Sequence, residues 1–152
     1  MELFLLRHAD ALPGTNDFER ELSPLGHQQA GKIAEWFLEN AGPECLADLQ
    51  ILVSPSIRTR QTVSYFRKEE NGIQLCMPLY ENTSPKEILD ILGWPDISIP
   101  TLIVGHQPLM GFLADRLLAG KPHPESFRKG ALWRLQFEPG KKNVRLVSVT
   151  EP

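Results

Sequence analysis

Short apolar runs, separated by polar segments rich in turn-forming residues, recur along the chain. The clearest runs lie at residues 3–6, 51–53 and 101–104, and a weaker one lies at 74–77. Unbroken runs of this length are typical of strands that are buried on both faces, as in parallel sheets. They predict at least three strands in the middle of a sheet.

Segments with apolar residues at helical spacing follow most of these runs. We expect helices at about 24–40, 56–70, 85–92 and 108–119. Two of them begin with Ser-Pro, which is typical of an N-cap residue followed by proline in the first helical turn. Alternating segments at 131–137 and 144–149, joined by turn-forming residues, predict a hairpin near the C-terminus.

The order of these elements predicts the fold class. Strand and helix alternate through most of the chain, and this favours an α/β fold with a mainly parallel sheet. The chain has 152 residues and no internal repeat or composition shift, so we expect a single domain over 1–152.

Charge and composition exclude several classes of protein. The chain has 16 Lys and Arg residues and 19 Asp and Glu residues, which gives a formal net charge of −3. This balance argues against a non-specific nucleic-acid binder and against a protein held on anionic membranes. No apolar run approaches the ~20 residues that a membrane-spanning helix needs. No signal peptide is evident, and the two widely spaced cysteines, Cys45 and Cys76, fit a reducing compartment, so we expect a cytoplasmic protein.

Basic side chains follow three of the predicted strands. Arg7 and His8 end the first run, Arg58 lies just beyond the second, and His106 follows the third. The carboxyl ends of parallel strands share one edge of the sheet, where ligands bind in α/β folds. We therefore expect two arginines and two histidines to converge there.

Such a set suits a phosphoryl group. Guanidinium groups offer paired donors that match phosphate oxygens. A neutral histidine can attack phosphorus, and a second, protonated histidine can stabilise charge on the oxygens. We also expect the helix that begins near residue 56 to direct backbone N–H groups to the same edge. No metal or other cofactor is expected, because the protein supplies the cations and lacks zinc-ligand spacing.

Four short blocks carry a resemblance to a known family. They are LRHA at 6–9, LSPLG at 22–26, SPSIRTRQT at 54–62 and VGHQP at 104–108. In order and spacing they resemble the signature blocks of the histidine phosphatase superfamily, and in particular its short SixA-like phosphohistidine phosphatases. The resemblance extends over about residues 2–118.

The resemblance implies a fold and a set of roles. The fold would be a three-layer α/β sandwich like that of phosphoglycerate mutase. His8 would be the nucleophile that becomes phosphorylated, and Arg7, Arg58 and His106 would hold the phosphoryl group. The partner would be a protein that bears phosphohistidine, such as a phosphorelay domain, or a small phosphorylated substrate; neither nucleic acid nor a membrane is expected.

Two departures from the family pattern bear on this reading. Ala9 stands where glycine is commonest, and Gln107 stands where some branches have an aspartate that acts as general acid. Glu81 lies near the place of the acid used by other branches, and it is a candidate acid; the alternative is an exposed loop carboxylate. Arg20 is a candidate substrate-binding residue, with a surface salt bridge as its alternative.

The lack of an aspartate at position 107 and the two readings of Glu81 bear on the substrate chemistry. An alcohol leaving group needs a proton in the transition state, whereas phosphohistidine releases an imidazole with a pKa near ~6.5 and needs less help. We therefore expect a phosphohistidine phosphatase with a covalent intermediate at His8. The alternatives are a phosphomonoesterase with Glu81 as its acid, and a binding module that has kept the pocket but not turnover.

Overall fold

The computed structural model describes residues 1–119 and 127–152. The elements, in chain order, are β1 (Glu2–Arg7), η1 (Asp17–Glu19), α1 (Pro24–Ala41), α2 (Pro43–Asp48), β2 (Gln50–Val53), α3 (Ile57–Val63), β3 (Ile73–Leu75), α4 (Met77–Tyr80), α5 (Pro85–Leu92), β4 (Thr101–Gly105), α6 (Leu109–Leu117), β5 (Leu132–Phe137) and β6 (Val144–Thr150). None of the helices in these residues is long and apolar enough to cross a membrane.

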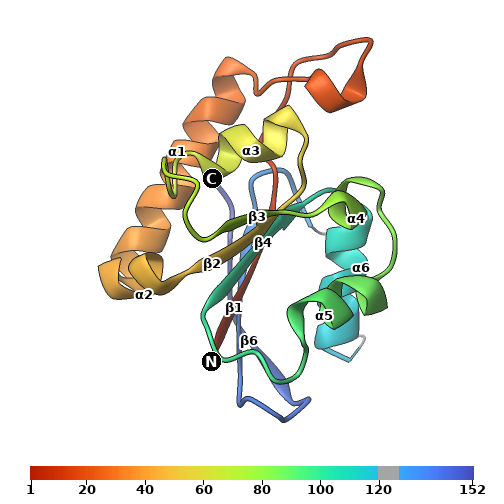
Figure 1. Ribbon diagram of the computed structural model, residues 1–152. Coiled ribbons are helices and arrows are strands. Elements are labelled where there is room, and N and C mark those ends of the chain that lie inside the picture. The colour runs from red at the N-terminus through yellow and green to blue at the C-terminus, as the bar shows by residue number, and fades with distance from the viewer. Residues whose placement is uncertain (120–126) are drawn as a thin grey trace.

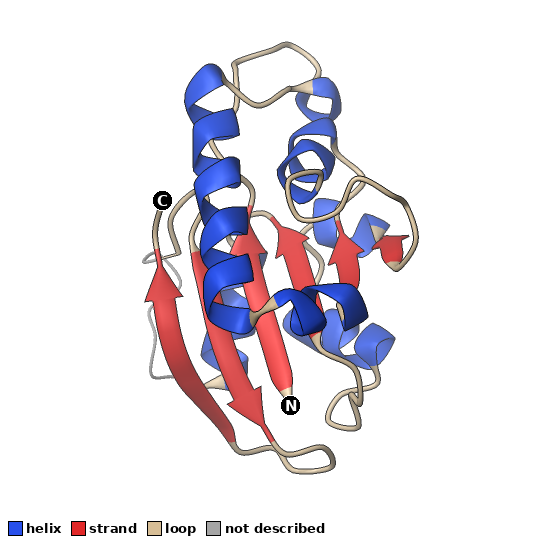
Figure 2. Cartoon of the chain, turned by 90° about the vertical axis from the view of Figure 1, so that its left-hand side faces the viewer, coloured by secondary structure: helices blue, strands red, loops and turns tan. Residues whose placement is uncertain are grey.

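The described strands form one six-stranded sheet in the order β3-β2-β4-β1-β5-β6. The first four are parallel neighbours, and β5 is antiparallel to both β1 and β6. The predicted α/β class with a mainly parallel sheet is confirmed, as is the C-terminal hairpin. Figure 2 shows the arrowheads of the parallel strands pointing to the end of the sheet over which the segment after β1 passes.

Helices cover both faces of the sheet (Figure 1). On one face lie α1, α2 and α3, and on the other lie α4, α5 and α6. Each face has its own hydrophobic cluster, because alternate side chains of the central strands point to opposite sides. The result is the three-layer arrangement that the resemblance implied.

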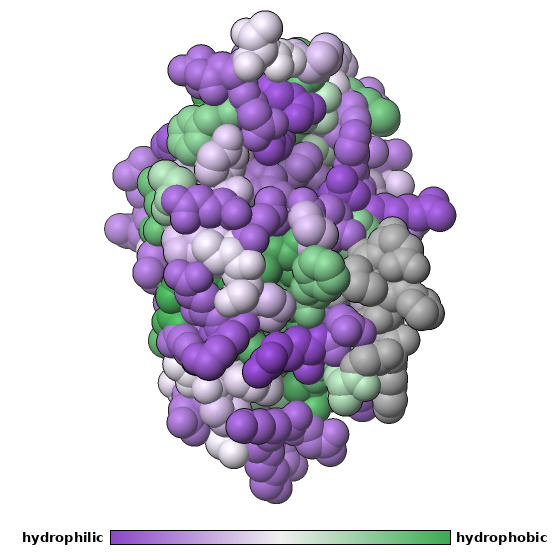
Figure 3. Space-filling model, turned by 90° about the vertical axis from the view of Figure 1, so that its right-hand side faces the viewer, coloured by the Kyte–Doolittle hydropathy of each residue, from purple (hydrophilic) through white to green (hydrophobic). Residues whose placement is uncertain are grey.

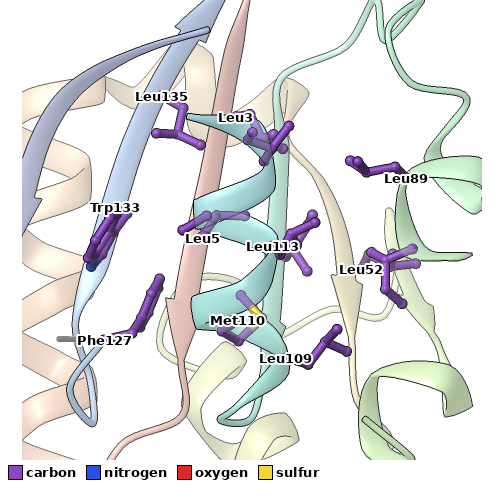
Figure 4. Packing of buried hydrophobic residues seen from close by; sticks show 14 of the residues in the cluster. Leu3, Leu5, Leu52, Leu89, Leu109, Met110, Leu113, Phe127, Trp133 and Leu135 are labelled. Atoms are coloured by element: carbon purple, nitrogen blue, oxygen red, sulfur yellow. The ribbon is translucent and has the colours of Figure 1, made fainter. Parts of the chain in front are cut away.

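The cluster beneath α6 shows how tightly this layer is packed (Figure 4). Leu109, Met110 and Leu113 of α6 lie over Leu5 of β1, and all four are fully or almost fully buried. Phe127 stacks on Trp133 with ring centroids 4.9 Å apart. This stack fixes the chain just before β5, close to the carboxyl end of β1.

The expected helix after β2 is too long. It begins as expected but ends at Val63, because the hydroxyl of Ser64 donates to the carbonyl of Gln61 and competes with the helical bond. Phe66 then turns inward against Phe37, with ring centroids 5.5 Å apart. The chain therefore leaves the helical path some seven residues before the expected end.

Three short helices were not expected. Gly42 ends α1 with a positive φ of 91°, and Pro43 then starts α2. The weak strand at 74–77 ends earlier, at Leu75, because Met77 begins α4. The third, η1, lies within the segment between β1 and α1.

One residue expected in the core lies on the surface. The spacing of apolar residues along 108–119 predicts that Phe112 packs inside, but its side chain is 48% exposed. The buried face of α6 is made by residues 109, 110, 113, 114 and 117, and position 112 falls on the opposite side of the helix. The prediction from periodicity is therefore wrong at this position, because the buried face of α6 does not include it.

The segment between β1 and α1 is tied down at its two ends. Ser23 caps α1 and its hydroxyl also donates to the Asp10 carboxylate at 2.6 Å. The backbone N–H of Leu22 donates to Gln61 at 2.7 Å. Gly26 lets the segment approach α1, since a Cβ at this position would lie 1.9 Å from the Asp10 carbonyl oxygen.

We predict that Gly26→Ala lowers the free energy of unfolding by about 1–3 kcal/mol, because the new methyl group collides with backbone. The matched control is Gly31→Ala in the same helix, where the Cβ would meet only the Tyr65 ring at 3.7 Å. That change should be neutral or stabilise by up to ~1 kcal/mol, because alanine favours helix. Urea unfolding of both variants measures the difference, and equal stabilities would contradict the packing described.

Candidate active site

The ends of β1, β2 and β4 lie level with one another. Arg7 pairs with Gly105, and Val53 pairs with Val104. The ladder continues one step further, because the N–H of His8 donates to the Gly105 carbonyl at 3.1 Å and that of Ser54 donates to the Val104 carbonyl at 3.0 Å. The side chains that follow the three strands therefore emerge at one edge of the sheet.

A cavity of about 300 Å³ lies at this edge. Its lining includes all four residues expected to converge, together with Arg20 and several residues that were not expected; the full set is Arg7, His8, Ala11, Asp17, Arg20, Arg58, Tyr80, Asn82, His106, Gln107 and Lys129. A larger hollow of about 560 Å³ lies between α3 and β3, but neither histidine lines it. The surface near the 8–22 segment is mainly polar, whereas apolar atoms gather lower on the same face (Figure 3).

His8 is held as a neutral imidazole with a defined tautomer. Its Nδ1 lies 2.7 Å from the Ala9 carbonyl oxygen, which can only accept, so Nδ1 carries the proton and Nε2 keeps its lone pair. Burial, reinforced by the positive charges of Arg58 and Arg7, lowers the pKa of His8 to about 4. The imidazole is therefore uncharged at neutral pH, as a nucleophile must be.

Ala9 fits where the family most often has glycine. Its side chain is fully buried beside Leu22 and Ala30, and its N–H donates to the Thr62 hydroxyl at 3.3 Å. A methyl group is accommodated here without opening the turn that holds His8.

His106 lies beside His8, with ring centroids 5.1 Å apart. Arg58 Nη2 donates to His106 Nδ1 at 3.3 Å, so the proton of the neutral ring is on Nε2, which donates to the Ser54 hydroxyl at 2.7 Å. Burial and the charges of His8 and Arg58 lower the pKa of His106 to about 3. His106 is therefore neutral at neutral pH in the site without a ligand, and a positive charge on it requires an anion beside it.

Each of the two arginines has a buried N–H donor that has no hydrogen-bond acceptor among the described residues. Arg7 Nη1 donates to the Phe127 carbonyl at 3.0 Å, and the terminal nitrogens of Arg58 contact Asp17 and His106. The Nε atoms of both arginines have no partner within residues 1–119 and 127–152. Buried N–H groups are rarely left without an acceptor. A bound oxyanion would supply acceptors for both.

The helix that was expected to direct backbone N–H groups to the cavity contributes in another way. α3 has only seven residues, and Arg58 is its one residue in the cavity lining. Gln61 and Thr62 of the same helix instead hold the 8–22 segment through their side chains. The helix thus serves as an anchor for Arg58 and for the loop.

Arg20 and Glu81 differ in their placement. Arg20 lines the cavity, but it donates to the Leu12 carbonyl at 2.9 Å and to Asp17 at 3.1 Å. Glu81 is exposed and is not in the lining, although its neighbours Tyr80 and Asn82 are. The structure does not bring Glu81 to the other four residues.

Sequence reasoning missed Asp17, Tyr80, Asn82 and Lys129 as residues of the cavity. Lys129 reaches it because β5 is antiparallel, so that the start of β5 lies at the carboxyl ends of its parallel neighbours. Its ammonium group pairs with Asp10 at 3.1 Å. Only the loop position of Asp17, between Arg7 and α1, gave a signal in the sequence.

Metal ligands are not gathered at this edge. Within residues 1–119 and 127–152, no group of three or more His, Cys, Asp or Glu side chains could hold a metal ion. The positive charge at the cavity comes from Arg7, Arg58, Arg20 and Lys129.

The chain is similar in sequence and fold to SixA proteins. The chain is 27% identical over 139 residues to phosphohistidine phosphatase SixA of Escherichia coli (strain K12), covering 82% of this chain and 78% of the relative. The structure of SixA from Agrobacterium tumefaciens matches at a TM-score of 0.79 and 28% identity, covering 99% of this chain and 97% of the other. The protein histidine phosphatase SixA in complex with tungstate matches at a TM-score of 0.84, 22% identity and the same coverage. No family model matches the chain.

In sequence and fold the chain is similar to SixA proteins of the histidine phosphatase superfamily. Its relatives there are phosphatases, and hence hydrolases. The similarity to SixA proteins agrees with the resemblance carried by the four sequence blocks of the chain.

We predict that His8 and His106 stay neutral at pH 5.5. Their lowered pKa values mean that protons bind only near pH 4 and below, whereas an imidazole with a pKa near ~6.5 is mostly charged at pH 5.5. Long-range ¹H–¹⁵N NMR of the two rings measures this directly. The same shifts make the free energy of unfolding fall as pH drops from about 6.5 towards 4, because the unfolded chain binds the protons first. Two charged rings at pH 5.5 would contradict the described burial.

Proposed function

We propose that the chain is a phosphohistidine phosphatase that acts on protein-borne phosphohistidine through a phosphorylated His8. The observation that carries the proposal is the neutral, tautomer-fixed His8 beside two arginines whose buried Nε donors have no acceptor in the part of the chain that the structure describes. A phosphoryl group would satisfy these donors and present phosphorus to the free Nε2 lone pair of His8. The names of the SixA relatives support the same substrate class.

In the first step, Nε2 of His8 attacks phosphorus and the P–N bond to the substrate imidazole breaks. When the other ring nitrogen of the substrate is protonated, the leaving group departs as neutral imidazole and needs no proton at that moment. Arg7 and Arg58 stabilise the phosphoryl oxygens by position and charge. The Nδ1–H of His8, which donates to the Ala9 carbonyl, stays in place as the ring becomes positively charged.

In the second step, water attacks phosphorus and the P–N bond to His8 breaks. The electron pair returns to Nε2, so His8 is again neutral, and inorganic phosphate is released with the proton from water. The low pKa of His8 makes its imidazole a good leaving group in this step.

The charge state of the acidic side chain in the cavity favours substrates with a P–N bond over substrates with a P–O bond. Among the described residues that line the cavity, the acidic one is Asp17. Burial raises its pKa, but hydrogen bonds from Arg20 and Arg58 outweigh this and hold the pKa of Asp17 below its usual range. Asp17 is therefore ionised at neutral pH and has no proton to give to an alcohol.

The rim of the cavity suits a substrate carried by another protein. Asp17 is 53% exposed and Lys129 is 47% exposed, and both line the cavity. A histidine side chain projecting from a protein surface could enter between these polar groups. We infer a phosphoprotein partner rather than a small metabolite enclosed by the site.

One assay distinguishes this proposal from its alternatives. The protein is mixed separately with a phosphohistidine peptide and with a phosphoserine peptide of the same sequence. Release of phosphate from the first alone supports the proposal. Faster release from phosphoserine supports a phosphomonoesterase, and binding without release supports a phosphoprotein-binding module.

We predict that His8→Ala lowers phosphohistidine turnover by about 10³-fold or more, since removing the nucleophile removes the covalent route. Phosphorylated protein, detected after an alkaline quench, should disappear with it. His27→Ala is the matched control, because His27 lies on α1 and donates or accepts a hydrogen bond with Tyr65 outside the cavity. Normal turnover by His8→Ala would rule out the covalent mechanism.

A further inference from the structure

We propose that Asp17 is a positioning residue for phosphoryl transfer. It holds the Nη1–Nη2 edge of the Arg58 guanidinium so that the adjacent edge, made by Nε and Nη2, faces the oxyanion. This inference rests on the proposed function. It adds a residue that none of the four sequence blocks contains.

Asp17 accepts hydrogen bonds from both terminal nitrogens of Arg58. Arg58 Nη1 donates to the backbone carbonyl oxygen of Asp17 at 2.6 Å, and Nη2 donates to Asp17 Oδ2 at 3.1 Å. A guanidinium group is a rigid plane with five N–H donors, so fixing one edge fixes the direction of the others. The edge that remains carries the buried Nε, which has no partner among the described residues.

The free edge of Arg58 lies on the side of the nucleophile. Nη2 also contacts His106 Nδ1 at 3.3 Å, and the His106 ring lies 5.1 Å from that of His8. An oxyanion that accepts from Nε and Nη2 would therefore lie next to both histidines. It would also take the Nη2 hydrogen bond from His106 Nδ1 and leave that nitrogen free to bind a proton.

Asp17 is itself held from several directions. Arg20 Nη1 donates to Oδ1 at 3.1 Å, and the Tyr80 hydroxyl donates to Oδ2 at 3.1 Å. The Tyr80 ring packs edge-on against Phe18, the next residue of η1, with centroids 5.1 Å apart. These contacts fix the carboxylate relative to α4 and to the loop, so it can hold the Arg58 guanidinium in one orientation. They also give Arg20 a role in holding Asp17.

An opposite role for Asp17 makes a different prediction. A carboxylate at the rim of an oxyanion site could act mainly by repulsion, and its removal would then tighten phosphate binding. If Asp17 acts by orienting Arg58, its removal weakens binding and slows phosphoryl transfer, because Arg58 loses its fixed direction. The side chain of Arg58 is only 7% exposed, so this ion pair is screened less than one at the surface.

The experiment compares Asp17→Ala, Asp17→Asn and Glu19→Ala. Glu19 is the matched control, because it is an exposed acidic residue of the same η1 turn and is outside the cavity lining. Two quantities are measured: the dissociation constant for inorganic phosphate, and the single-turnover rate of His8 phosphorylation by phosphoramidate. Thermal unfolding of each variant checks that the fold is kept.

We expect Asp17→Ala to slow His8 phosphorylation by about ten- to a hundredfold, as misplacement of a catalytic group does, and to weaken phosphate binding by a smaller factor. Asp17→Asn keeps an acceptor for Arg58 and should recover part of the rate, while Glu19→Ala should match the unmodified protein. In an Arg58→Ala background, Asp17→Ala should change the rate less than twofold, because the group it orients is gone.

Three results would overturn the proposal: tighter phosphate binding by Asp17→Ala, equal losses in Asp17→Ala and Glu19→Ala, or an undiminished effect of Asp17→Ala in the Arg58→Ala background. Failure of the unmodified protein to phosphorylate His8 would instead overturn the proposed function. The phosphate affinities of the variants would still test the role of Asp17 in that case.

Discussion

The burial of positive charge and neutral imidazole at one edge of the sheet is the constraint on which the site depends. Arg58, His8 and His106 are each less than a tenth exposed, and removing them from water is costly unless a negative group is nearby. The chain compensates in part with Asp17 and with backbone carbonyls. Among the described residues, the Nε donors of Arg7 and Arg58 are left without an acceptor, and they define the chemistry that the site can bind.

The fold places these groups through parallel pairing. Level ends of β1, β2 and β4 bring Arg7, His8, Ser54 and His106 together across about a hundred positions of sequence. This part could be predicted, because each apolar run ends at a polar residue and parallel strands share their carboxyl edge. The α/β class and the terminal hairpin follow from the same local patterns.

The rest of the site depends on contacts that leave no local pattern. Asp17 comes from a turn whose path is set by Gln61 and Gly26, and Lys129 comes from the start of an antiparallel strand. The charge state of His106 is equally non-local, since it follows from burial and from neighbouring charges. A sequence can indicate which residues carry chemistry, but these three effects need the assembled fold.

The most direct test of the central claim is a crystal structure of this protein with tungstate bound. We predict that the oxyanion lies at the carboxyl edge of the sheet, within hydrogen-bond distance of the Nε atoms of Arg7 and Arg58, with His106 beside it and Nε2 of His8 directed at the tungsten. An oxyanion bound elsewhere, or one at this edge that neither Nε contacts, would contradict the account.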